Sequence, residues 1–236
     1  MNKLTLTKLL AATAILLSAP AMAVDITANG GLNTQYIFRG IPQSDDKAAA
    51  FGGLDIEQSG FYVGTWGSTV DSGSVEVDTT TGSGGSSGTD GIEIDVYGGY
   101  GGEVGDFSYG IGFTLYRYTD SFDDDYNELN LSGGWKFLSL AVDVGEYENF
   151  SGPTQDYQHS LLKAEYSGFY GSWGSFYDDF DGDYFTAGYT NTLTVADTDL
   201  FDYDFSVIYS DDTLLGGSSD TNLVLQITKT FDVFSN

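Results

Sequence analysis

Cysteine, proline and basic residues are absent or scarce in this sequence. It has no cysteine and three prolines, and its 8 Lys and Arg residues face 35 Asp and Glu residues, a net charge of −27. Without cysteine, neither a disulfide nor a thiolate metal site can form, so stability must come from packing and backbone hydrogen bonds. The shortage of basic residues argues against nucleic acid as a partner, because phosphate binding depends on Lys and Arg.

Long apolar runs are also scarce, and the clearest one covers residues 9–17. It follows Lys3 and Lys8 and precedes Ala21-Met22-Ala23, which is the order of regions in a secretory signal peptide. The run is shorter than the roughly 20 residues that a membrane-spanning helix needs, and no later segment supplies one. We therefore predict a signal peptide at 1–23 and one exported domain at 24–236.

Glycine and aromatic residues are abundant: 32 Gly, 17 Tyr and 16 Phe. Aromatic side chains fit pleated sheets, and glycine suits turns and close packing. Apolar and polar residues alternate through much of the chain; residues 92–96, for example, read Ile-Glu-Ile-Asp-Val. This period of two predicts twelve strands, at 32–39, 49–57, 61–70, 92–100, 107–118, 126–135, 138–147, 157–166, 169–177, 184–190, 201–209 and 222–231.

The connections between these strands alternate between short turns and longer polar loops. Short turns are expected at 58–60, 101–106, 136–137 and 167–168, with 191–200 as a longer exception; long loops are expected at 40–48, 71–91, 119–125, 148–156, 178–183 and 210–221. This alternation is typical of outer-membrane barrels, whose strands are about 10 residues long. We therefore predict an all-β, antiparallel, up-and-down transmembrane barrel of about 12 strands in a Gram-negative outer membrane, surrounded by lipid and lipopolysaccharide. A secreted soluble β-sandwich shares the alternation and is the alternative fold.

The polar faces of these strands define the expected lumen. Its predicted lining residues are Arg39, Asp55, Glu57, Glu93, Asp95, Glu128, Asp143, His159, Lys163 and Glu165, with Asp202 and Asp204 on the same face. Acidic rings favour cations, so the set indicates a cation-favouring pore; hydrated acids that merely fill a narrow barrel are the alternative for any single residue. Tyr97, Tyr116 and Tyr118 also face the lumen, where they could plug it.

Arg39 and His159 are the two lumen residues with the most specific possible roles. Arg39 either pairs with the loop acids Asp45 and Asp46 or acts as the positive counterpart of the acidic wall at a constriction. His159 is the only histidine and so the only side chain suited to general base catalysis near neutral pH, but no nucleophile is marked beside it. We expect no enzymatic activity, catalytic residue, metal site or cofactor. The acidic segment 178–183 fails the EF-hand spacing and is expected to be a solvated turn.

One phrase of turn, aromatic pair and Trp-Gly-Ser occurs twice, at 59–68 and 167–175. Aromatic residues beside short turns suit the boundary between lipid and water. The predicted interface aromatics are Phe61, Tyr62, Trp66, Phe169, Tyr170 and Trp173. The second copy is one residue shorter before its tryptophan, so the two tryptophans point to opposite faces unless a β-bulge restores the register.

Two phrases, at 36–44 (Tyr-Ile-Phe-Arg-Gly-Ile-Pro-Gln-Ser) and 59–68 (Ser-Gly-Phe-Tyr-Val-Gly-Thr-Trp-Gly-Ser), resemble the Gcw_chp family of proteobacterial exported proteins, also called TorF-like porins. Segments 93–100, 126–129 and 228–231 look like the same family, so the resemblance covers essentially the whole mature chain. It implies an outer-membrane barrel with a porin role and an undefined solute. The long insertion at 79–91 departs from the family.

Sequence and resemblance together predict a porin for passive diffusion of small cationic or neutral solutes. The alternative is a closed barrel with a structural or ligand-binding role through its acidic external loops.

Overall fold

The computed structural model describes residues 24–73 and 89–235. The predicted signal peptide and most of the insertion at 79–91 lie outside the described residues. The described chain forms one closed antiparallel sheet, in which β1 pairs with both β4 and β14. Its twelve strands are β1 (Asp25–Asn33), β4 (Ala49–Gln58), β5 (Phe61–Asp71), β6 (Asp90–Val104), β7 (Phe107–Tyr118), β8 (Tyr126–Trp135), β9 (Leu138–Tyr147), β10 (Gln155–Tyr166), β11 (Phe169–Asp178), β12 (Gly182–Val195), β13 (Thr198–Ser210) and β14 (Asp220–Ser235).

This closed sheet confirms the predicted all-β, twelve-strand antiparallel barrel, and the two-sheet sandwich is excluded. Closure pairs each of the twelve barrel strands with two neighbours, so the barrel sheet has no open edge. Among the described residues, no helix is long and apolar enough to cross a membrane.

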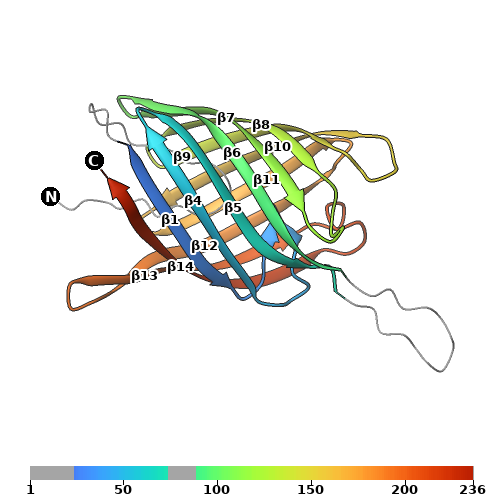
Figure 1. The fold of residues 1–236 in the computed structure, drawn as a ribbon. Coiled ribbons are helices and arrows are strands. Elements are labelled where there is room, and N and C mark those ends of the chain that lie inside the picture. Colours follow the sequence, from blue (N-terminus) through green and yellow to red (C-terminus); the bar gives the residue numbers. More distant parts are fainter. Residues whose placement is uncertain (1–23, 74–88, 236) are drawn as a thin grey trace.

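Short turns and long loops lie at opposite ends of the barrel (Figure 1). We call them the turn end, which also holds the start of β1 at Asp25 and the end of β14 at Ser235, and the loop end. The predicted Ser-Gly turns are present: φ is 53° at Ser59 and 86° at Gly60, and 53° at Ser167 and 84° at Gly168. Positive φ at both central residues matches the hairpin turns whose twist suits paired strands. The longer connection expected at 191–200 is instead a tight turn at 196–197, because β12 and β13 run further than predicted.

The first strand is the main correction to the sequence-based prediction. It covers Asp25–Asn33 rather than 32–39, and residues 34–48 fold into the barrel as a segment that we call the inner loop. The inner loop contains a small hairpin of β2 (Ile37–Phe38) and β3 (Ile41–Pro42). Its aromatic residues imitate a strand in the sequence, but they bury their rings inside the barrel: Tyr36 packs on Trp66 and Phe38 on Tyr116.

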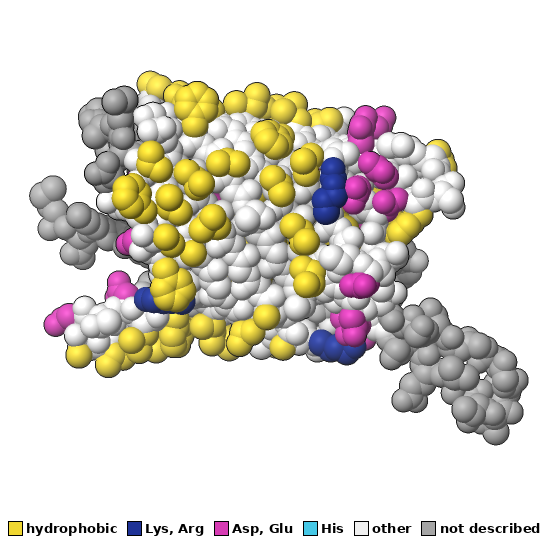
Figure 2. Space-filling model, viewed as in Figure 1, with side chains coloured by type: hydrophobic (Ala, Val, Ile, Leu, Met, Phe, Trp, Pro, Cys, Tyr) yellow, Lys and Arg dark blue, Asp and Glu magenta, His cyan; other side chains and the backbone are white. Residues whose placement is uncertain are grey.

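The outer face of the wall is apolar around the barrel. Outward side chains such as Leu131, Val144 and Phe205 are exposed, whereas their inward neighbours are polar or buried. Figure 2 shows hydrophobic side chains spread over the visible wall and acidic side chains near its two ends, mostly at the loop end. This is the reverse of a soluble protein, whose apolar residues face inward.

Aromatic side chains pack in pairs on the outer face near the turn end. Phe61 packs on Tyr100 at 4.9 Å between ring centroids, Phe107 on Trp135 at 6.2 Å, and Phe169 on Tyr189 at 4.7 Å. All six residues belong to strand segments beside short turns. Such a belt is found where barrel walls pass from lipid to water.

Candidate functional site in the barrel lumen

Strand register gathers a row of polar side chains on the inner wall. Asp143 on β9 lies directly opposite Asn130 on β8 and His159 on β10. The Asn130 amide donates to Asp143 Oδ1 at 2.9 Å and to Glu128 Oε2 at 3.1 Å. The His159 Nδ1 lies 3.0 Å from Asp143 Oδ2. Three neighbouring strands thus place two carboxylates, an amide and an imidazole side by side.

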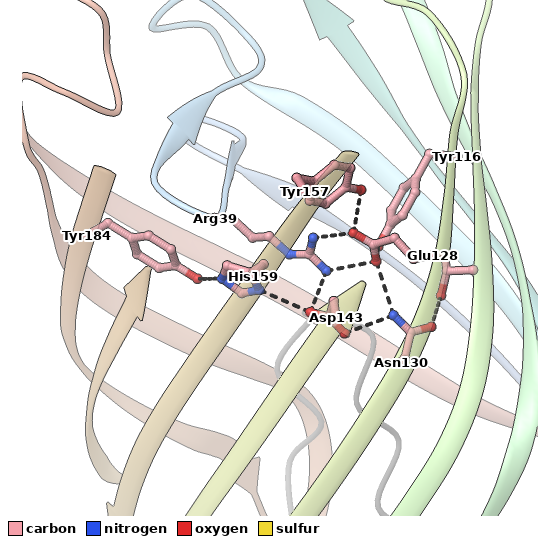
Figure 3. Close-up of polar contacts among 9 residues, drawn as sticks. Arg39, Tyr116, Glu128, Asn130, Asp143, Tyr157, His159 and Tyr184 are labelled. Atoms are coloured by element: carbon pink, nitrogen blue, oxygen red, sulfur yellow. Dashed lines mark hydrogen bonds and ion pairs between the residues drawn. The ribbon is translucent and has the colours of Figure 1, made fainter. Parts of the chain in front are cut away.

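Arg39 joins the inner loop to this row (Figure 3). Its Nη1 bonds to Glu128 Oε1, and its Nη2 donates to Glu128 Oε2 at 3.0 Å and to Asp143 Oδ2 at 2.9 Å. The guanidinium also stacks over the Phe38 ring, 4.7 Å from its centroid. Bidentate pairing of this kind fixes orientation as well as charge, so the inner loop is clamped to the wall.

Burial and the neighbouring carboxylates have opposite effects on the pKa of Arg39. Burial disfavours the charged guanidinium, but the carboxylates of Glu128 and Asp143 outweigh it and raise the pKa of Arg39 well above its usual value. The residue therefore stays charged. Asp46, one of the two loop acids predicted as a possible partner, instead accepts a hydrogen bond from Gln35 at 2.8 Å. The partners of Arg39 are instead the wall acids Glu128 and Asp143.

The next residue, Gly40, seats the loop against the other side of the barrel. Its φ is +82°, and its carbonyl accepts a hydrogen bond from Ser210 at 2.6 Å. A Cβ at this position would lie 2.6 Å from the Tyr184 Cβ and 2.8 Å from Leu214 Cδ2. Only glycine combines this backbone conformation with so close an approach.

Three tyrosines complete the hydrogen bonds of the row, and the sequence had marked only one of them, Tyr116. Tyr157 donates to Glu128 Oε1 at 2.7 Å, Tyr116 donates to Glu128 Oε2 at 3.0 Å, and the Tyr184 hydroxyl lies 3.0 Å from His159 Nε2. The alternation of inward and outward residues along β10 and β12 could have placed Tyr157 and Tyr184 on the inner face. Their partners, by contrast, depend on register.

His159 is closed in on both sides. It is 1% exposed, and its two ring nitrogens are taken by Asp143 and Tyr184. Phe176 packs against the ring at 4.8 Å. The arrangement orients the imidazole but gives a substrate no access to it.

Glu93 and Asp95 form a second acidic group on the wall, on β6. Tyr36 of the inner loop donates to Glu93 Oε1 at 2.9 Å. Glu93 Oε2 and Asp95 Oδ1 have no hydrogen-bond partner among the described residues, although both side chains are buried. Inward placement of both acids was predicted, but the unpartnered oxygen on each of them could not be.

The turn-end half of the lumen is more open. Lys163 bonds to Glu165 at 2.7 Å, and both side chains are partly exposed. Tyr97 donates to Asp55 at 2.6 Å. The other inward acids there are Glu57, which is partly buried, Asp202, which accepts from Thr192, and Asp204, which accepts from Tyr170. The predicted lining residues on the strands thus all face inward, but the structure divides them into an open group and a buried one.

Aromatic side chains crowd the loop end. The Tyr126 and Tyr147 rings stack at 4.4 Å, and those of Tyr157 and Phe180 at 4.7 Å. Both tyrosine hydroxyls of the first pair donate to Asp123 at 2.8 Å. Together with the inner loop, this group narrows the lumen on the loop side of Arg39.

Three of the predicted interface aromatics lie on the inner face instead. Trp66 and Tyr170 are buried, and the Tyr62 hydroxyl points at Gly99 and Gly112 on the inner wall. Alternation along each strand explains the error, because neighbours in an aromatic pair face opposite ways. Phe61, Phe169 and Trp173 are exposed on the outer face.

The part of the chain that the structure describes contains no group of three or more His, Cys, Asp or Glu side chains that could hold a metal ion. The acidic segment 178–183 covers the end of β11, a short connection at 179–181 and the start of β12, where Asp183 accepts from the Trp173 indole at 3.2 Å.

Comparison with known proteins gives a family and a distant structure. The Gcw_chp family, described as a bacterial protein of unknown function, matches residues 18–160. This confirms the resemblance carried by 36–44 and 59–68, although β11–β14 lie outside the matched range. No curated protein matches the chain. Among solved structures, the outer membrane protease OmpT of Escherichia coli is similar, with 11% identity, a TM-score of 0.28, and coverage of 87% of this chain and 92% of that chain.

Proposed function

Since this chain belongs to the Gcw_chp family, whose function is unknown, we propose its role from its own geometry: an outer-membrane barrel that conducts small cationic or neutral solutes through an acidic lumen. The observation that carries the proposal is the inner loop clamped by Arg39 to the acidic wall. A loop held inside a barrel by a buried ion pair, with further bonds from Tyr36 to Glu93 and from Ser210 to Gly40, defines a constriction.

The outer face supports a membrane location. It is apolar around the wall and bears an aromatic belt beside the short turns. In water, that much exposed apolar surface would drive aggregation. In a lipid bilayer the same surface is stabilising, and lipid and lipopolysaccharide become its neighbours.

The inner face supports cation preference. Acidic residues line both halves of the lumen, and Arg39 and Lys163, the predicted basic lining residues, are each paired with carboxylates. A low-dielectric wall with one sign of charge concentrates ions of the opposite sign. Cations and neutral solutes would therefore enter more readily than anions.

We propose no catalytic role. A general base must reach a substrate, and His159 is buried with both ring nitrogens taken.

Planar-bilayer recording of the purified mature protein tests the proposal. We expect small, infrequent openings with a reversal potential that favours cations in a salt gradient. The R39Q variant should open more often, because the loop loses its clamp. A clear anion preference would contradict the acidic-lumen argument.

A closed barrel with a structural or binding role is the second candidate, and the aromatic group of Tyr126, Tyr147, Tyr157 and Phe180 at the loop end favours it. If both the wild-type protein and R39Q insert into bilayers and neither conducts, this candidate replaces the channel. Release of the protein in the soluble periplasmic fraction without detergent would contradict both.

A further inference from the structure

The buried charges on the loop-end wall do not balance. Glu93 is 0% exposed and Asp95 8%, and Glu128 and Asp143 are also buried. Among the described residues, Arg39 is the one Lys or Arg bonded to this set, and its nitrogens go to Glu128 and Asp143; the His159 imidazole also contacts Asp143. Glu93 and Asp95 have no ion pair with any residue that the structure describes.

The hydrogen bonding of individual carboxylate oxygens shows the same lack of partners. Asp95 Oδ1 and Glu93 Oε2 are buried acceptors without a hydrogen-bond donor among the described residues. An unpaired buried carboxylate is costly, because it loses its water and gains nothing in exchange. The two residues are neighbours on one face of β6, about 7 Å apart along the strand by β-strand geometry. Two like charges at this spacing add repulsion to the loss of water.

The surroundings suit a small cation. On β5 and β7, the residues directly opposite Asp95 are Trp66 and Tyr116, whose rings also face the interior. Aromatic faces attract cations, most of all where water is excluded. Tyr36 closes the site from the inner loop: it packs on Trp66 at 5.6 Å and donates to Glu93.

We propose that Glu93 and Asp95 bind one monovalent metal cation, such as Na⁺ or K⁺, beneath the inner loop. Two carboxylates carry enough charge for such an ion, whereas the usual divalent sites need more ligands from acids. The proposal goes beyond conduction, because an ion held here neutralises the wall whether or not solutes pass.

Tryptophan fluorescence can test the site directly. The chain has three tryptophans, and Trp135 and Trp173 lie on the outer face. The full mature protein with W135F and W173F therefore keeps Trp66 alone as a reporter beside Asp95. Its emission is titrated with NaCl or KCl, and with N-methylglucamine chloride at matched ionic strength, at one alkaline pH.

We expect a saturable change in emission with Na⁺ or K⁺ and none with N-methylglucamine. Added D95N should weaken the apparent affinity at least about tenfold, and E93Q/D95N should abolish the response. E165Q, which removes an acid at the turn end, should leave the titration unchanged. The double variant should fold, because it removes uncompensated charge; its thermal midpoint should no longer depend on the identity of the cation.

Other outcomes overturn the proposal. Emission that follows pH but ignores the cation would mean that protons neutralise the pair. A response that survives in E93Q/D95N would place the ion elsewhere, and no response to either variable would mean that no ion binds near Trp66. None of these results depends on bilayer conductance, so a failure here is distinct from a failure of the channel proposal.

Discussion

Trp66 and Trp173 lie on opposite faces of the barrel wall. Trp66 is buried inside, between Tyr36 and Phe51, whereas Trp173 is exposed outside and donates to Asp183. The strands that carry them, β5 and β11, pair with their neighbours without a register shift. The missing residue in the second copy of the repeated phrase is therefore enough to turn one tryptophan into the lumen and the other away from it.

Lipids with brominated acyl chains should distinguish the two tryptophans. In bilayers of such lipids, the variant that keeps only Trp173 should lose much of its emission, because the ring touches the acyl chains. The variant that keeps only Trp66 should lose little, since the wall separates the ring from lipid. Fluorescence intensity relative to unbrominated bilayers is the measurement. Equal quenching of both would contradict the facing described above.

Much of the fold could be predicted because alternation is a local property. A period of two gives the face of each residue as soon as the strand is identified, which is why Glu93, Asp143 and Lys163 were placed inside. Turn chemistry is local as well, and Ser59-Gly60 and Ser167-Gly168 lie where the dipeptides predicted them.

The inner loop and its contacts could not be predicted in this way. Arg39 lies 89 residues before Glu128 and 104 before Asp143, so their pairing depends on the path of a whole loop through the lumen. The aromatic residues at 36–38 satisfied a strand pattern equally well, because the same rings can face lipid or pack inside. Whether these rings face lipid or pack inside is decided only when the barrel closes around the inner loop.

Arg39 should be the residue on which the inner loop depends most. The R39Q variant leaves Glu128 buried without a base and Asp143 with the His159 imidazole alone, and breaking a buried pair from one side costs about 3–5 kcal/mol. We expect the loop to leave the wall, with faster proteolysis within 34–48 on the intact barrel. The triple variant R39Q/E128Q/D143N should recover most of the stability in denaturant unfolding, because it removes both signs of charge.

K47Q is the matched control for R39Q. Lys47 belongs to the same loop and pairs with Asp71, but its side chain is largely exposed. Solvent screens such pairs, so neither stability nor protease sensitivity should change. Equal effects in K47Q and R39Q would mean that the loop is held by its general charge rather than by the buried clamp.

G40A tests the opposite side of the loop. Alanine must adopt φ near +82° and push its Cβ against Tyr184 and Leu214. The conformation alone costs about 1–2 kcal/mol, and the clash adds to it. G216A is the control, because Gly216 has φ +66° and open space around it. We expect both variants to lower the unfolding free energy, but only G40A to make residues 34–48 accessible to protease. If G216A exposes the same residues, backbone strain rather than the contact with Tyr184 and Leu214 would explain the effect of G40A.

An arginine on the outer face distinguishes a lipid-facing wall from a water-facing one. Leu131 is 41% exposed and lies directly opposite Ile111 and Val142, two apolar side chains on the same face. Surrounded by lipid, L131R should lower the unfolding free energy by about 2–4 kcal/mol, since the charge must enter hydrocarbon. In water the same change at an exposed position would stay within about 0.5 kcal/mol.

The control for L131R is the same kind of substitution at a position near the edge of the membrane. Val104 also faces outward, but it ends β6 at the turn end, where the wall leaves the lipid. V104R should therefore cost only about 0–1 kcal/mol. Denaturant unfolding of both variants in lipid bilayers measures the difference. If L131R is no more destabilising than V104R, the apolar face does not meet hydrocarbon, and its exposure must be explained by another protein surface that covers it.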